Sequence, residues 1–129
     1  MFAERTNVVK MRKKNLIYLI VAIVVLVALI YLIVLRTNAP GKYDSFAQCL
    51  TDNGVVMYGT DWCRFCQDQK GRFGAKSFKL IDYVNCDFNG AECANAGVQG
   101  YPTWLINEQT YSGVQSLQSL SSLTGCSLE

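Results

Sequence analysis

Two cysteines near the middle of the chain, Cys63 and Cys66, stand two residues apart behind Trp62, in the stretch GTDWCRFCQDQK. The polar residues that follow are typical of a helix, which places Cys63 at a helix N-terminus and Cys66 one turn inside it. Unpaired backbone N–H groups and the helix dipole favour a thiolate at the first position, and Arg64 adds a positive charge beside it. We therefore predict a dithiol that exchanges electrons with other thiols, with Cys63 as nucleophile and Cys66 as resolving cysteine.

Zinc is the competing use of these thiols. A four-cysteine site would need Cys63, Cys66, Cys86 and Cys93, but six residues separate the second pair, where zinc sites usually have two to four. The chain has no histidine, which excludes mixed Cys/His zinc sites and histidine-based nucleophilic catalysis. A purely structural bond within the pair is disfavoured because so tight a loop strains a disulfide. We expect neither a metal nor an organic cofactor.

The elements around the dithiol alternate between helix and strand. Apolar periodicity and turn residues predict, in order, a helix at 43–52, a buried strand at 55–59, a helix from the cysteine pair to about residue 72, a strand within 78–86, a short helix at 91–96, a strand at 104–107, a strand from residue 111 after a turn at 107–109, and a helix at 115–124. This order predicts an α/β layer fold whose last two strands form a hairpin.

Residues 16–35 read LIYLIVAIVVLVALIYLIVL, without a charge, Gly or Pro. As a helix with a rise of about 1.5 Å per residue they span roughly 30 Å, the thickness of a bilayer core. A domain this small does not enclose a helix that is apolar on all faces, and the alternative of a cleaved signal peptide lacks a clear cleavage site. We predict a cytoplasmic basic tail (1–15), a transmembrane anchor (16–35), a linker (36–42) and an extracytoplasmic domain (43–129).

Charge and cysteine distribution agree with this division. Residues 1–36 carry six Lys and Arg against one acid, whereas residues 37–129 carry six against nine. The positive-inside rule then places the N-terminus in the cytoplasm of a single-pass protein of the cell membrane. All six cysteines follow the anchor, where an oxidising compartment permits disulfides. The C-terminal domain has no basic stripe, which argues against nucleic acid as a partner.

Several motifs resemble those of a known family. WCRFC, YPTW, a strand hairpin and a C-terminal helix resemble the thioredoxin fold. More narrowly, MYGTDWCRFCQDQK, YVNC, GVQGYPTWLIN and YSGVQSLQSL resemble the thioredoxin-like domain that is fused to, or paired with, bacterial and archaeal homologues of vitamin K epoxide reductase. The resemblance covers about residues 44–126. It implies that Cys63 and Cys66 are the redox pair, that Pro102 is cis, and that Cys86 and Cys93 form a second bridge.

The resemblance also indicates where a substrate binds, and where this chain departs from its relatives. The expected substrate groove contains Trp62, Arg64, Tyr101, Pro102 and Thr103, with the backbone of Tyr101 pairing with an extended substrate strand. Arg64 and Phe65 stand between the cysteines, where the relatives often carry Pro and His. Met57 occupies the strand position at which thioredoxins keep a buried acid.

The four other cysteines allow three pairings once Cys63 and Cys66 are set aside. In the pairing that contains Cys86–Cys93, a bond between Cys49 and Cys126 would tie the first helix of the domain to the last. In the chain-entropy model these two bonds contribute at most about 2.5 and 4.5 kcal/mol.

Of three functions that the sequence leaves open, we predict the first. It is a membrane-anchored thiol–disulfide oxidoreductase that acts as an oxidase or electron shuttle for secreted proteins, coupled to a quinone-linked membrane partner of the vitamin K epoxide reductase type. The second is an extracytoplasmic disulfide reductase or isomerase. The third is a non-catalytic interaction domain held together by three disulfides. Reduction potentials of dithiols in this fold run from about −270 to about −120 mV, and the sequence does not place a member on that scale.

Overall fold

The computed structural model describes residues 2–128 and divides into two compact units, with the boundary along the chain between Ala39 and Pro40. The first unit is helix α1 (Phe2–Thr37), within which Arg12–Thr37 is long and apolar enough to cross a membrane, judged by length and composition. Neither Gly nor Pro interrupts the sequence from Phe2 to Thr37, so the helix runs back through the predicted basic tail. It ends shortly before Pro40, since the residue before a proline disfavours helical geometry.

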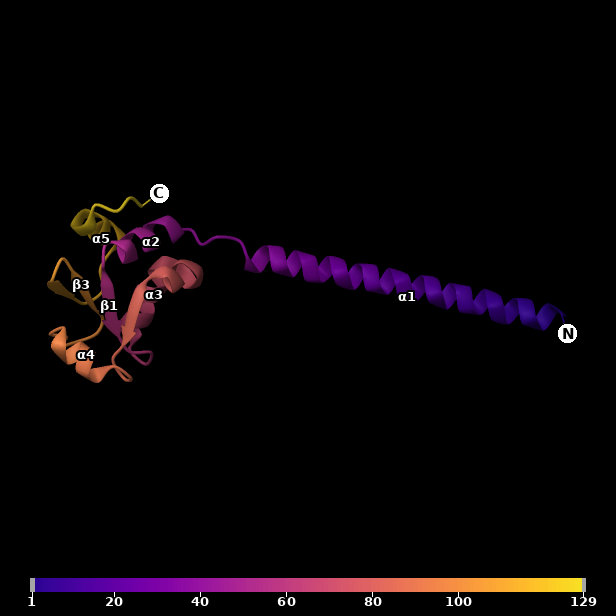
Figure 1. Ribbon diagram of the computed structural model, residues 1–129, viewed down its shortest axis with the longest axis horizontal. Coiled ribbons are helices and arrows are strands. Elements are labelled where there is room, and N and C mark those ends of the chain that lie inside the picture. The colour runs from indigo at the N-terminus through magenta and orange to yellow at the C-terminus, as the bar shows by residue number, and fades with distance from the viewer. Residues whose placement is uncertain (1, 129) are drawn as a thin grey trace. The chain divides into compact units, whose positions relative to one another are not determined.

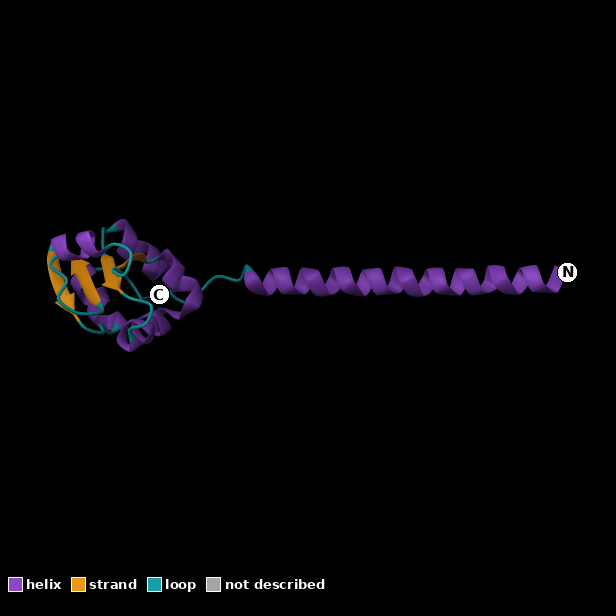
Figure 2. Ribbon diagram, turned by 90° about the horizontal axis from the view of Figure 1, so that it is seen from below, coloured by secondary structure: helices purple, strands orange, loops and turns teal. Residues whose placement is uncertain are grey.

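The second unit contains a four-stranded sheet with helices around it (Figures 1 and 2). Its elements are α2 (Asp44–Asp52), β1 (Val56–Gly59), α3 (Arg64–Ser77), the 3-10 helix η1 (Phe78–Leu80), β2 (Asp82–Asn85), α4 (Gly90–Asn95), β3 (Thr103–Ile106), β4 (Gln109–Ser112) and α5 (Leu117–Thr124). The strand order is β2-β1-β3-β4, with β1 parallel to β2 and the other neighbours antiparallel. This is the predicted α/β layer fold with a terminal hairpin.

Alternate residues of each strand face opposite sides of the sheet, and each side has its own core. Met57 of β1 packs on one side, with the buried residues of α2, α3 and α5. Tyr58, the next residue, packs on the other side against Cys86 and against Cys93 of α4. Three helices therefore cover one face and the short α4 covers the other.

Two predicted boundaries are wrong. Helix α3 does not end near residue 72 but continues to Ser77 across Gly74, whose φ of 79° and ψ of 155° interrupt the helical geometry. Gly74 permits this kink because it lacks a Cβ. Strand β4 begins at Gln109 rather than residue 111, because Asn107 and Glu108, both at positive φ, form the turn by themselves.

Candidate active site

Cys63 lies at the N-terminus of α3 as its N-cap residue. Its backbone is extended (φ −75°, ψ 118°), and its sulfur accepts a hydrogen bond from the backbone N–H of Cys66 at 3.4 Å. The thiol also donates to the carbonyl oxygen of Tyr101 at 3.7 Å. The sulfur of Cys63, the predicted nucleophile, thus lies between the N-terminus of α3 and the backbone of the loop at Tyr101.

Cys66 lies one turn into α3 and is completely buried, and neither cysteine is in a disulfide. Burial raises the pKa of the Cys66 thiol to about 11, with a smaller contribution from the neighbouring Cys63, while a hydrogen bond from the backbone of Thr60 and the charge of Lys70 act in the opposite direction. The strand behind it approaches closely at Gly59, where an added Cβ atom would lie 2.7 Å from the Cys66 sulfur. Gly59 is therefore the residue that gives this thiol its space.

The loop before β3 supplies the opposite wall of the site. The peptide bond between Tyr101 and Pro102 is cis, and the Pro102 side chain is fully buried. The Thr103 side chain, predicted to line the groove, is also buried and donates to the carbonyl oxygen of Gly100 at 2.8 Å. Thr103 therefore supports the loop from inside, because its hydroxyl satisfies a backbone acceptor of the loop.

Large side chains next to the dithiol remain in solvent. Trp62 is 72% exposed, stacks edge-on against Tyr101 with ring centroids 6.2 Å apart, and donates from Nε1 to Asp87 at 3.1 Å. Phe65, between the two cysteines, is 63% exposed, and Arg64 is exposed as well. Exposed aromatic side chains of this kind are typical of surfaces that bind a partner.

Asp61, just before Trp62, is the centre of a polar cluster that the sequence did not reveal. Its carboxylate accepts from Lys70 Nζ at 2.8 Å and from Asn85 Nδ2 at 2.9 Å, with a longer contact to the Tyr83 hydroxyl at 3.5 Å. The hydrogen bond and the charge of Lys70 lower the pKa of Asp61. Burial and the charge of Asp61 raise the pKa of Tyr83.

Gln69 is a second feature that sequence reasoning missed. Its side chain is fully buried on α3, and its Oε1 accepts from Trp104 Nε1 at 3.2 Å and from the backbone N–H of Gln115 at 2.7 Å. Its Nε2 donates to the carbonyl oxygen of Gln115 at 3.1 Å. A single side-chain amide thus joins α3, the helix of the dithiol, to β3 and to the segment before α5. The one signal for the burial of Gln69 in the sequence is its position three residues after Cys66, on the same face of the helix.

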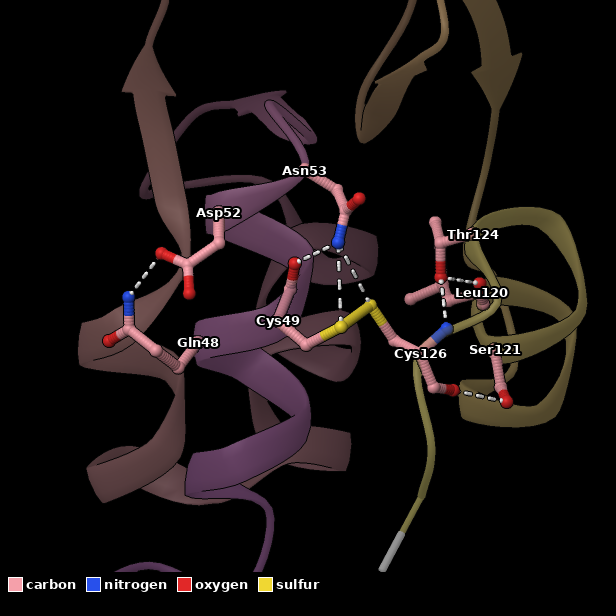
Figure 3. The surroundings of a disulfide bond; sticks show 8 residues. All are labelled: Gln48, Cys49, Asp52, Asn53, Leu120, Ser121, Thr124 and Cys126. Atoms are coloured by element: carbon pink, nitrogen blue, oxygen red, sulfur yellow. Dashed lines mark hydrogen bonds between the residues drawn. A yellow bond between two sulfur atoms is a disulfide. The ribbon is translucent and has the colours of Figure 1, made fainter.

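The remaining cysteines form two disulfides, in the pairing described above. Cys86 and Cys93 are bonded to each other, with a Cα–Cα distance of 5.8 Å, and Cys49 is bonded to Cys126. The amide of Asn53 lies against the second bond, 3.5 Å from each sulfur (Figure 3). The four-cysteine zinc site considered above would need Cys86 and Cys93 as thiolates, and the disulfide between these two cysteines precludes it.

The sheet order, the free cysteine pair at the N-terminus of α3 and the cis-proline loop beside it define a thioredoxin-like domain with a site of the thiol–disulfide oxidoreductase class. The chain is 38% identical over 93 residues to thiol-disulfide oxidoreductase LTO1 of Arabidopsis thaliana. The aligned region covers 66% of this chain and 25% of that relative, so the chain spans about a quarter of the relative's length. No family model matches the chain.

Solved structures with some likeness to the chain include three redox proteins. A mutant thioredoxin from Halobacterium salinarum has a TM-score of 0.42 and 22% identity, over 60% of this chain and 81% of its own. The first thioredoxin domain of mouse protein disulfide-isomerase A4 has a TM-score of 0.42 and 15% identity, over 62% and 67%. Oxidised glutaredoxin 2 from Chlamydomonas reinhardtii has a TM-score of 0.38 and 19% identity, over 66% and 97%.

Proposed function

We propose that this chain is a membrane-anchored thiol–disulfide oxidoreductase. As an oxidase, its Cys63–Cys66 disulfide is attacked at the Cys63 sulfur by a client thiolate outside the cytoplasm, Cys66 leaves as a thiolate, and a second client thiol displaces Cys63, so that the client is oxidised and the dithiol is reduced. In the reverse direction Cys63 attacks a client disulfide, and Cys66 then attacks the Cys63 sulfur and releases the client as a thiol. The observation that carries this proposal is the placement of the Cys63 sulfur at a helix N-terminus, 3.7 Å from the Tyr101 carbonyl oxygen, with the second free thiol directly behind it. A substrate strand would lie along the backbone of Tyr101, between the exposed Trp62 and Arg64.

The anchor and its orientation are part of the proposal. Residues 16–35 would span the bilayer, because α1 has the required length and no charge in that interval. The five basic residues before the span favour a cytoplasmic N-terminus and an extracytoplasmic domain. A membrane-impermeant protease added to intact cells should degrade the domain, whereas full protection of the domain would contradict this orientation.

A dithiol that turns over outside the cytoplasm needs a partner that resets it. The resemblance to domains associated with vitamin K epoxide reductase homologues supports a quinone-linked membrane protein of that type, which would reoxidise the dithiol and make this chain an oxidase or electron shuttle. An anchor holds the domain near the membrane surface and raises its effective concentration for a membrane-embedded partner.

Trapping tests both the activity and the partner. In a Cys66→Ser variant the resolving step is lost, so mixed disulfides through Cys63 should accumulate in native membranes, and they should include a polytopic membrane protein together with secreted clients. The matched control, Cys63→Ser with Cys66→Ser, should trap nothing. Soluble clients alone would favour a reductase or isomerase, and an absence of any mixed disulfide would favour a non-catalytic domain.

The reduction potential of the Cys63–Cys66 pair fixes the direction of electron flow. A value near the oxidising end of the range, about −120 mV, is expected for an oxidase, and a value near −270 mV would indicate a reductase. Thiol counting under mild reductant provides a further check, because an oxidised dithiol should release two thiols well before the other four.

A further inference from the structure

The surroundings of Cys66 leave one step of the proposed reaction unexplained. A thiol with a pKa of about 11 is almost entirely protonated at neutral pH, yet only the thiolate attacks a disulfide. Met57 of β1 lies in the same core cluster as Cys66 and is apolar, so it offers this thiol no acid or base. A charge that stabilises the thiolate must come from elsewhere in the domain.

Lys70 lies four residues after Cys66 on α3, so the two side chains are neighbours on one face of the helix. Its Nζ lies 4.0 Å from the ring centroid of Tyr83. The same ring reaches Gly59, where an added Cβ atom would lie 3.3 Å from Cε2 of Tyr83 and 2.7 Å from the Cys66 sulfur. The ring edge of Tyr83 and the buried sulfur thus meet at one glycine, and the ammonium of Lys70 lies over the same ring.

Asp61 holds Lys70 in this position. The two charges are 2.8 Å apart, the Lys70 side chain is 20% exposed and that of Asp61 is 65% exposed. Asn85 fixes the other carboxylate oxygen at 2.9 Å. The ammonium of Lys70 is therefore fixed between the carboxylate of Asp61 and the ring of Tyr83, and its positive charge lowers the pKa of Cys66.

We propose that Lys70 is a positioning residue for the exchange step, whose ammonium stabilises the Cys66 thiolate. The inference depends on the proposed function of the dithiol. Cys66 loses its proton to water and attacks the Cys63 sulfur; the bond between Cys63 and the client breaks, the Cys63–Cys66 bond forms, and the departing client thiolate takes a proton from water. The client sulfur is reduced and the dithiol is oxidised. In the reverse direction Cys66 is the leaving thiolate, so Lys70 assists oxidation and reduction alike.

The test separates the two chemical steps in the full chain, reduced at the dithiol and held in detergent. The probe is the aromatic disulfide 5,5′-dithiobis(2-nitrobenzoate), which releases one coloured thiolate when Cys63 attacks and a second when Cys66 resolves the mixed disulfide. In Lys70→Met, which keeps the packing of the stem on Tyr83 and removes the charge, the second release at pH 7.5 should slow roughly three- to tenfold. The midpoint of its pH profile should rise by about half to one pH unit.

Controls distinguish charge from packing. Lys70→Arg keeps the charge and should retain the profile, and Lys79→Gln, which removes a lysine on η1, should behave as the unaltered chain. The other titratable groups around this thiol are Cys63, Asp61, Tyr83 and, beyond the ring, Asp87, and all are kept in these variants.

Three results would overturn the role of Lys70: an unchanged second release in Lys70→Met, equal slowing of both releases, or an arginine variant as slow as the methionine variant. If the unaltered chain gives no first release, the proposed function itself fails, because Cys63 is then not a nucleophile. If Lys70→Met does not fold, the comparison of Lys70→Arg with Lys70→Gln decides the same question.

Discussion

Two regions of the domain hold fully buried cysteines in different chemical states. Cys66, in the dithiol, and Cys126, in the bond to Cys49, are 0% and 1% exposed. The dithiol lies within one helical turn and reaches a backbone carbonyl next to exposed aromatic side chains. The Cys49–Cys126 bond joins α2 to the residue after the C-cap of α5, 77 residues apart, and the amide of Asn53 covers both sulfurs (Figure 3).

This comparison shows that burial alone does not distinguish a redox cysteine from a structural one. What distinguishes them is the number of residues between the partners and the groups that surround the sulfur. A disulfide that closes a long loop removes much conformational entropy from the unfolded chain and so stabilises the fold. A helix N-terminus or a nearby ammonium instead stabilises a thiolate and so favours thiol exchange. The two regions should therefore respond differently to substitution.

The largest effect is expected from Cys63→Ala. Thiol–disulfide exchange should fall by roughly a thousandfold or more, as for the loss of a nucleophile, since the other free thiol is buried and protonated. Stability against urea should change little. Exchange at an undiminished rate would show that Cys63 is not the nucleophile.

Replacement of Cys49 and Cys126 by Ser should have the opposite effect. The free energy of unfolding should fall by up to about 4.5 kcal/mol, because the bond closes a loop of 77 residues, while exchange through Cys63 persists. Replacing Cys86 and Cys93, which close a loop of seven, should cost up to about 2.5 kcal/mol. Urea unfolding and an exchange assay on the folded variants measure both effects. Loss of exchange in a folded Cys49→Ser/Cys126→Ser variant would place that pair in the electron path.

Gly59→Ala should damage the dithiol region selectively. The new Cβ would lie 2.7 Å from the Cys66 sulfur, so we expect overpacking that lowers the free energy of unfolding by about 1–3 kcal/mol. Resolution of the mixed disulfide by Cys66 should also become slower. Gly71→Ala is the matched control on α3, because nothing lies within 4 Å of its added Cβ, and it should stabilise the domain by about 0.5–1 kcal/mol. Equal effects of the two substitutions would contradict the close contact at Gly59.

A similar loss of stability, without a direct effect on the thiols, is expected at the link between α3 and the segment before α5. Gln69→Leu should cost about 1–3 kcal/mol, because the N–H groups of Trp104 and Gln115 lose their acceptor inside the domain. Gln118→Leu, at an exposed position of α5, should stay within about 0.5 kcal/mol of the unaltered chain. Thermal or urea unfolding of both variants checks this, and an unchanged stability in Gln69→Leu would show that the amide is dispensable.

Local patterns predicted the elements well where they depend on nearby residues. Ser116 at the N-cap and Gly125 beyond the last turn bound α5 within two residues of the expected limits. The predicted boundary near residue 72 failed because the kink at Gly74 lets packing against α2 and η1 continue the helix. The predicted start of β4 failed because Asn107 and Glu108, neither of them glycine, both adopt positive φ and make a two-residue turn between β3 and β4.

The sequence by itself determined the apolar N-terminal helix, the α/β order and the cysteine pair at a helix start, because each depends on residues only a few positions apart. Only the tertiary structure decided the pairing of the other cysteines, the buried position of Thr103, the link through Gln69 and the position of Lys70 over the ring of Tyr83. These features join segments up to 77 residues apart, and contacts at such separations are set by how helices pack on the sheet rather than by local preference.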